Sequence, residues 1–219
     1  MPEGLDFEMW EGPAPHRDYR PALLPLQWRH NYDYSGGMVT DFGAHHIDIA
    51  QWGMETQLTG PVRFEKIKGT MPDKDALYNT ATKFYFECVY ENGIRMIVSD
   101  ANPTGITFEG EGGKSIYCNR GVLESNPEEI RRGKIEEGDK RLYESNNHER
   151  NFIDCVYSGE PTAAPIEVAH RTITIAHLAN LGLRLGKSEF AWDPKAEKSG
   201  DSEVDAMLSR PLRAPWSLA

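Results

Sequence analysis

The stretch GGMVTDFGAHHIDIAQW, residues 36–52, places two carboxylates and an imidazole at helical spacing. An α-helix turns by about 100° per residue, so Asp41, His45 and Asp48 are expected on one face. That face is polar and titratable, whereas an ordinary amphipathic helix separates an apolar face from a solvated one. The stretch therefore predicts a helix over residues 36–54 that lines a cleft, with Asp41 and His45 as its chemical groups.

Each of these residues also has a structural interpretation. Asp41 and His45 can form a simple intrahelical hydrogen bond, and Asp48 can either orient the His45 ring or be a solvated charge. His46 lies off the face and is interpreted as a core histidine or as support for its neighbour. A metal site is disfavoured, because adjacent histidines point apart on a helix and no i, i+4 histidine pair is present in this helix. The sequence predicts no metal ligand.

Composition indicates a soluble globular domain. The chain has 219 residues, of which 39% are hydrophobic and 26% charged, enough to bury a core. Its net charge of −10 disfavours nucleic acid and anionic membranes as partners, since both attract basic surfaces. Cys88, Cys118 and Cys155 are too scattered for a disulfide framework or a zinc motif. With no membrane span or secretory leader visible, we expect a cytoplasmic protein, unless a leader precedes the residues given.

Residues 1–35 are rich in proline and aromatic residues and show little periodicity, which indicates an extended crossover. The crossover ends near Trp28 and Tyr34 and leads directly into the predicted helix. Aromatic rings beside polar side chains can stack on the apolar face of a sugar while its hydroxyls are hydrogen-bonded. We therefore predict a substrate loop with Trp28 and Tyr34 as binding residues, and Trp28 as a buried anchor is the alternative.

After the helix, the hydrophobic period changes from 3.6 to 2. Alternating runs around Asn92-Gly93 predict one hairpin, and a second surrounds the glycine-rich residues 110–113. A phosphate loop at that second turn is excluded, because Phe108 stands where such a loop needs glycine and strands flank the run. We expect residues 61–124 to form an open antiparallel sheet, with helices on one face and the other face free to contact another subunit.

The remaining segments are expected to support this sheet. Residues 126–142 are charged and irregular, as is typical of a solvated surface. Two helices are predicted within residues 146–186, the second ending at Gly186, and the tail, residues 187–219, is predicted to carry a short helix. His148 opens the first of these helices. His148 and Asp48 are further candidates for substrate contact, with a structural histidine and a solvated charge as the respective alternatives.

The stretch that opens at Gly36 resembles the catalytic helix of the Gfo/Idh/MocA oxidoreductases, whose pattern is Gly-Gly, a short apolar step and Asp-x-x-x-His. The resemblance to a bacterial subgroup of that family continues, in order, along nearly the whole chain. It is carried by GLDFEMWEGPAP at 4–15, NFIDCV at 151–156, WDP at 192–194, GD at 200–201 and RAPW at 213–216.

This resemblance implies that residues 1–219 form a single α+β domain, the C-terminal catalytic and oligomerisation domain of a sugar or polyol dehydrogenase. Members of the family begin with a Rossmann domain, which binds NAD or NADP and supplies a lysine in a Glu-Lys-Pro motif. Neither feature occurs in this sequence. The cofactor-binding residues are therefore unknown, and we expect no tight NAD or NADP binding and no redox activity from this chain alone. The implied partners are a sugar or polyol, the missing Rossmann domain and another copy bound through the sheet.

In the complete enzyme, we expect His45 to act as general base on a substrate hydroxyl, with Asp41 holding His45 or binding the same hydroxyl. Two other hypotheses remain. The chain can be a stand-alone sugar-binding or partner module. Alternatively, the same cleft can perform lyase, epimerase or hydrolase chemistry on sugars, with Asp41 and His45 acting alone or with a metal.

Overall fold

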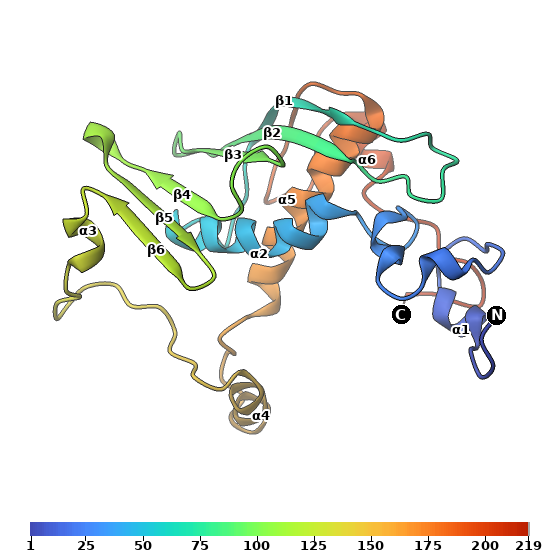
Figure 1. Cartoon of the computed structure of the whole chain (residues 1–219), viewed down its shortest axis with the longest axis horizontal. Coiled ribbons are helices and arrows are strands. Elements are labelled where there is room, and N and C mark those ends of the chain that lie inside the picture. Colours follow the sequence, from blue (N-terminus) through green and yellow to red (C-terminus); the bar gives the residue numbers. More distant parts are fainter. Residues whose placement is uncertain (219) are drawn as a thin grey trace.

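The computed structural model describes residues 1–218 and has an α+β fold (Figure 1). Its strands form two antiparallel sheets. The two longest helices, α2 (Met38–Gly53) and α5 (Ile166–Leu185), pack on each other and lie on one side of the first sheet. The fold class expected from the sequence is confirmed, but the expectation of one continuous sheet is wrong.

The first sheet has the strand order β3-β2-β1-β7. Its strands are β1 (Arg63–Thr70), β2 (Lys83–Val89), β3 (Arg95–Ser99) and the short β7 (Phe190–Ala191). Phe86 and Cys88 alternate into the core from β2, as the period of two predicts. The predicted turn at Asn92-Gly93 joins β2 to β3, and Gly93 supplies its positive φ of 83°.

The second sheet has the order β4-β5-β6. It consists of β4 (Ile106–Glu109), β5 (Ser115–Asn119) and β6 (Val122–Asn126). The chain leaves the first sheet after β3, because Pro103 cannot donate to a ladder and Gly105 has a φ of 141° against the Tyr117 ring. Phe108 instead packs on Gly53 at the end of α2. The glycine-rich run, with the turn η3 (Glu111–Gly113), connects β4 to β5 as predicted.

The amino-terminal residues are more regular than the predicted crossover. They form α1 (Phe7–Glu11), η1 (Pro21–Leu23) and η2 (Gln27–His30). Asp6 caps α1 by accepting a hydrogen bond from the Met9 amide. The carboxy-terminal tail returns to this region, where Arg213 donates to the carbonyls of Gly12 and Ala14. The two chain ends thus form one lobe beside the start of α2 (Figure 1).

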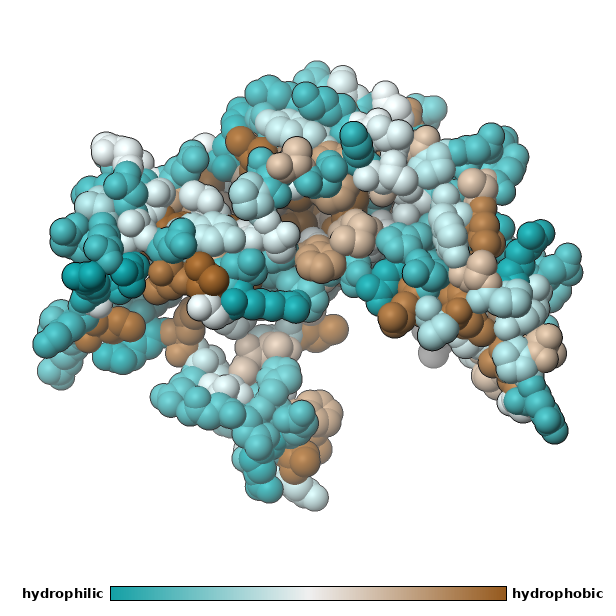
Figure 2. Space-filling view, viewed as in Figure 1, coloured by the Kyte–Doolittle hydropathy of each residue, from teal (hydrophilic) through white to brown (hydrophobic). Residues whose placement is uncertain are grey.

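Helices α4 (His148–Ser158), α5 and α6 (Ser202–Ala206) follow the predicted order, and α5 ends at Gly186 with a φ of 65°. In contrast, α3 (Glu129–Arg132) is a short helix within residues 126–142, which were expected to be irregular. Helix α4 projects from the body of the molecule, and Figure 2 shows apolar residues in brown on it. Phe152, Val156 and Tyr157 on this helix are all more than half exposed. None of the helices in residues 1–218 has the length and apolar composition of a membrane span.

The outer face of the first sheet carries a network of charges. Glu87 is only 2% exposed, although it points away from the core, because Tyr85, Lys66 and Arg95 cover it. Hydrogen bonds from Lys66, Tyr85 and Arg95 lower the pKa of Glu87 to about 2. Ile97 lies opposite Glu87 on β3 and is 51% exposed.

The backbone at Gly37 determines how α2 begins, and this can be tested by substitution. Gly37 has φ 67° and ψ −157°, a conformation essentially restricted to glycine, and a Cβ there would lie 2.3 Å from the Thr80 hydroxyl. We expect Gly37→Ala to destabilise the chain by about 2–4 kcal/mol in urea unfolding.

Gly43→Ala in the same helix is the matched control. A Cβ at Gly43 would make only ordinary contacts, at 3.5 Å or more, and alanine favours the helix by up to about 1 kcal/mol. Equal effects of the two substitutions would contradict the assigned role of Gly37.

Candidate functional site

The start of α2 is fixed from two sides. The Asn180 side chain on α5 donates to the Gly36 carbonyl at 2.8 Å, and the Gly37 amide donates to the Arg29 carbonyl at 2.8 Å. A Cβ on Gly36 would collide with Thr40 and Asn180, so the close approach requires glycine. The helix that carries Asp41 and His45 is therefore held against both the core and the preceding loop.

Asp41 lies in the first turn of α2, where the helix dipole favours a carboxylate. Arg29 Nη1 donates to Asp41 Oδ2 at 2.7 Å, and each side chain is 30% exposed. Within residues 1–218, Asp41 Oδ1 has no hydrogen-bond partner and no hydrogen bond joins Asp41 to His45. The intrahelical bond suggested by their spacing is thus replaced by an ion pair with the loop.

His45 lies one turn after Asp41 and is exposed. Its neighbour His46 is half-buried and stacks on the Phe42 ring, with 6.1 Å between the ring centroids. Burial, followed by the charge of His45, lowers the pKa of His46 and favours its neutral form. The two histidines thus differ: His46 packs on the Phe42 ring and lies outside the core, whereas His45 is exposed.

Asp48 and His148 do not form part of one group with Asp41 and His45. Asp48 accepts a hydrogen bond from the Thr172 hydroxyl at 3.0 Å, which ties α2 to α5. His148 is the exposed first residue of the projecting helix α4. Among the described residues, no hydrogen bond or ion pair connects either one to Asp41 or His45. Their roles in substrate binding stay predictions.

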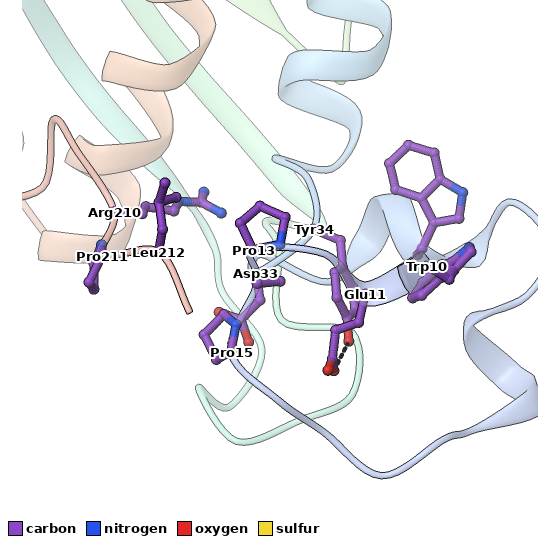
Figure 3. Close-up of a pocket in the computed structure, with 11 residues that line it drawn as sticks. Trp10, Glu11, Pro13, Pro15, Asp33, Tyr34, Arg210, Pro211 and Leu212 are labelled. Atoms are coloured by element: carbon purple, nitrogen blue, oxygen red, sulfur yellow. Dashed lines mark hydrogen bonds between the residues drawn. The ribbon is translucent and has the colours of Figure 1, made fainter. Parts of the chain in front are cut away.

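Trp28 and Tyr34 line a cavity of about 460 Å³ in the amino-terminal lobe (Figure 3). Its other lining residues are Trp10, Glu11, Pro13, Ala14, Pro15, Asp33, Arg210, Pro211 and Leu212. Asp41 and His45 do not line it, so this cavity is not the cleft that was predicted along their helix face. Arg29 connects the cavity with the Asp41 and His45 pair, because it follows Trp28 in the chain and its side chain binds Asp41.

Glu11 holds the cavity wall together. Its side chain has no exposed surface and accepts hydrogen bonds from the Tyr34 hydroxyl, the Arg17 amide and the His16 ring. Burial and the Glu11 charge raise the pKa of Tyr34 to about 12, so its phenol stays protonated at neutral pH. Sequence reasoning missed both Glu11 and Arg29, whose partners lie on other elements and leave no periodic signal.

The described residues do not fit a dinucleotide. Such a site needs a strand, a glycine-rich turn and a helix in succession, with the helix N-terminus facing the phosphates. The glycine-rich run of this chain leads from one strand into another, β4 into β5. In residues 1–218, no three histidine, cysteine or acidic side chains are placed to hold a metal ion.

Comparison with known proteins gives one family match. The Gfo/Idh/MocA family model described as "Oxidoreductase family, C-terminal alpha/beta domain" matches residues 1–218. No curated protein matches the chain. Among solved structures, an aldose-aldose oxidoreductase from Caulobacter crescentus complexed with glycerol is similar, with a TM-score of 0.45 and 13% identity. The match covers 76% of this chain and 51% of that one, so the chain spans about half the length of that protein.

The Arg29–Asp41 pair makes a measurable prediction. Because both side chains are partly exposed, we expect Arg29→Gln and Asp41→Asn to show a coupling energy of about 0.5–1 kcal/mol in a double-mutant cycle of urea unfolding. Arg29→Gln combined with Asp48→Asn is the control and should be additive, since Asp48 binds Thr172 instead. Additivity in both cycles would contradict a stabilising role of the ion pair in solution.

Proposed function

Because the chain belongs to the Gfo/Idh/MocA oxidoreductase family as its C-terminal α/β domain, we propose that it binds the substrate and transfers the proton in an NAD(P)-dependent sugar or polyol dehydrogenase. The observation that carries the proposal is the exposed His45 beside Asp41, whose carboxylate is held by Arg29 at the start of α2. This arrangement presents a base and a fixed acceptor to a hydroxyl group.

The two side chains have distinct tasks in this proposal. Arg29 fixes the Asp41 carboxylate through Oδ2, which leaves Oδ1 to accept a hydrogen bond from the substrate. The exposed His45 imidazole accepts the hydroxyl proton, and imidazole exchanges protons readily near neutral pH. Residues four apart are neighbours on a helix face, so two hydroxyls of one substrate can reach the two groups. The reacting hydroxyl donates its single proton to His45, and a neighbouring hydroxyl donates to Asp41 Oδ1.

NAD or NADP supplies the hydride acceptor, and we assign its binding to a separate nucleotide-binding domain because this chain does not fit a dinucleotide. The surface around His45 supports a covering partner. Phe42 and Ile49 flank His45 on α2 and are 40% and 42% exposed. A domain that covers these apolar side chains would also exclude water from the reacting groups.

The proposed chemistry can be tested in a complete enzyme, made by joining this chain to a nucleotide-binding domain of the same family. We expect oxidation of a sugar or polyol with NAD or NADP, followed by absorbance of the reduced nicotinamide. His45→Ala and Asp41→Asn should each lower kcat about 10²–10⁴-fold, the usual contribution of a positioned acid or base.

His170→Ala is the matched control, since His170 is exposed on α5 and pairs with Glu197. Its rate should equal that of the parent enzyme. Unchanged rates in both the His45 and Asp41 variants would refute the assigned proton transfer.

We propose further that two copies associate through the outer face of the first sheet. Ile97 exposes half of its apolar side chain there, beside the covered charge of Glu87.

We expect Ile97→Lys to convert an oligomer into a monomer in sedimentation velocity, because a lysine would be buried beside the like charges of Lys66 and Arg95. Ile135→Lys, at a residue 63% exposed outside the sheets, should leave the assembly unchanged. A monomeric parent chain at all concentrations would rule out this association.

A further inference from the structure

The cavity in the amino-terminal lobe has the size and the walls of a ligand site. Its volume of about 460 Å³ falls within the range of small-molecule pockets, which is roughly 300–1,000 Å³. Trp10 forms a fixed wall, because its ring stacks on Phe7 and meets the Tyr34 ring edge-on, with centroids 5.4 Å and 5.1 Å away. Trp28 adds a ring that is 36% exposed. The cavity therefore offers preformed aromatic surface.

The cavity is built from both ends of the chain. Figure 3 shows Arg210, Pro211 and Leu212 from the tail across from Trp10 and Tyr34 of the amino-terminal segment. Arg213 fastens the two together through its hydrogen bonds to the Gly12 and Ala14 carbonyls. Glu11 is part of the lining, but its side chain has no exposed surface, so we assign it to supporting the wall.

The polar groups of the cavity favour a neutral ligand with many hydroxyls. The Asp33 carboxylate is paired with Arg17. The Arg210 guanidinium stacks on the Tyr32 ring, with its central carbon Cζ 4.1 Å from the ring centroid. The lining thus contains both positive and negative side chains, and the charge of Asp33 is already neutralised by Arg17. Neither indole N–H of Trp10 or Trp28 has an acceptor within residues 1–218, so both can donate to a ligand oxygen. Aromatic faces together with such mixed donors and acceptors suit the apolar face and the hydroxyl rim of a sugar ring.

The cavity is separate from the proposed reacting groups but adjacent to them. Asp41 and His45 do not line it, so a ring inside the cavity is not the ring that they act on. The cavity and the reacting groups are joined through two consecutive residues: Trp28 lines the cavity, and Arg29 binds Asp41 at 2.7 Å. A ligand that fills both places must therefore extend beyond one ring.

We propose that this cavity binds a non-reacting sugar ring, so that the ligand of the chain is a disaccharide or another glycoside. The position of the reacting ring rests on the proposed function, whereas binding in the cavity does not. The cavity supplies affinity and orientation through Trp28 and Trp10, and α2 receives the second ring.

Binding to the chain itself tests the proposal without any redox reaction. Titration calorimetry and tryptophan fluorescence are measured with cellobiose, maltose, methyl β-glucoside and glucose as probes. We expect at least one disaccharide to bind about tenfold more tightly than glucose. Trp28→Ala should weaken that binding about five- to tenfold, the effect of losing one aromatic stacking contact.

Trp216→Ala is the matched control, because Trp216 is 37% exposed and does not line the cavity. Its affinity for the disaccharide should stay within about twofold of the parent value, a difference below about 0.4 kcal/mol. Absence of binding by all four probes, or equal affinities of the Trp28→Ala variant and the parent chain, would overturn the proposal.

The complete enzyme separates this proposal from the proposed function. Trp28→Ala should raise KM for the disaccharide about five- to tenfold and leave kcat nearly unchanged, whereas His45→Ala lowers kcat. Disaccharide binding that depends on Trp28, without any oxidation, would support the cavity and refute the dehydrogenase. Oxidation of single sugars that is indifferent to Trp28 would refute the cavity and support the dehydrogenase.

Discussion

The close approach of backbone and side chains at Gly36 and Gly37 is the constraint on which the rest of the site depends. A side chain at either position would collide with Thr40, Thr80 or Asn180, so only glycine lets the loop enter α2 at this angle. The Gly37 amide then binds the Arg29 carbonyl, which brings Arg29 within 2.7 Å of Asp41. One tight turn thereby fixes the helix, the loop before it and the ion pair between them.

Features encoded by neighbouring residues could be read from the sequence. The period of two in β2, the turn at Asn92-Gly93 and the end of α5 at Gly186 all follow from local spacing. These residues act within one element or one turn, so their pattern is continuous along the chain. The motif at the start of α2 was the strongest signal for that helix and for the proposed site.

Features that depend on distant partners could not be read in this way. The Arg29–Asp41 pair joins two elements, and Arg213 meets the Gly12 and Ala14 carbonyls from the opposite end of the chain. The split of the sheet depends on the path taken after β3 and on the packing of Phe108 against Gly53, neither of which alters the alternating pattern. Periodicity predicts a strand but does not specify which sheet it joins.

The family assignment and the site geometry together support the proposal that α2 forms one wall of an active site. Helix α2 presents Asp41 and His45 on an exposed surface flanked by apolar side chains, and the described residues lack a dinucleotide fold. A crystal structure of the complete enzyme with a bound disaccharide tests this proposal most directly. We predict one substrate hydroxyl within about 3.2 Å of a His45 ring nitrogen and a neighbouring hydroxyl within the same distance of an Asp41 oxygen, the reach of a hydrogen bond. A sugar bound beyond hydrogen-bond reach of both side chains would contradict it.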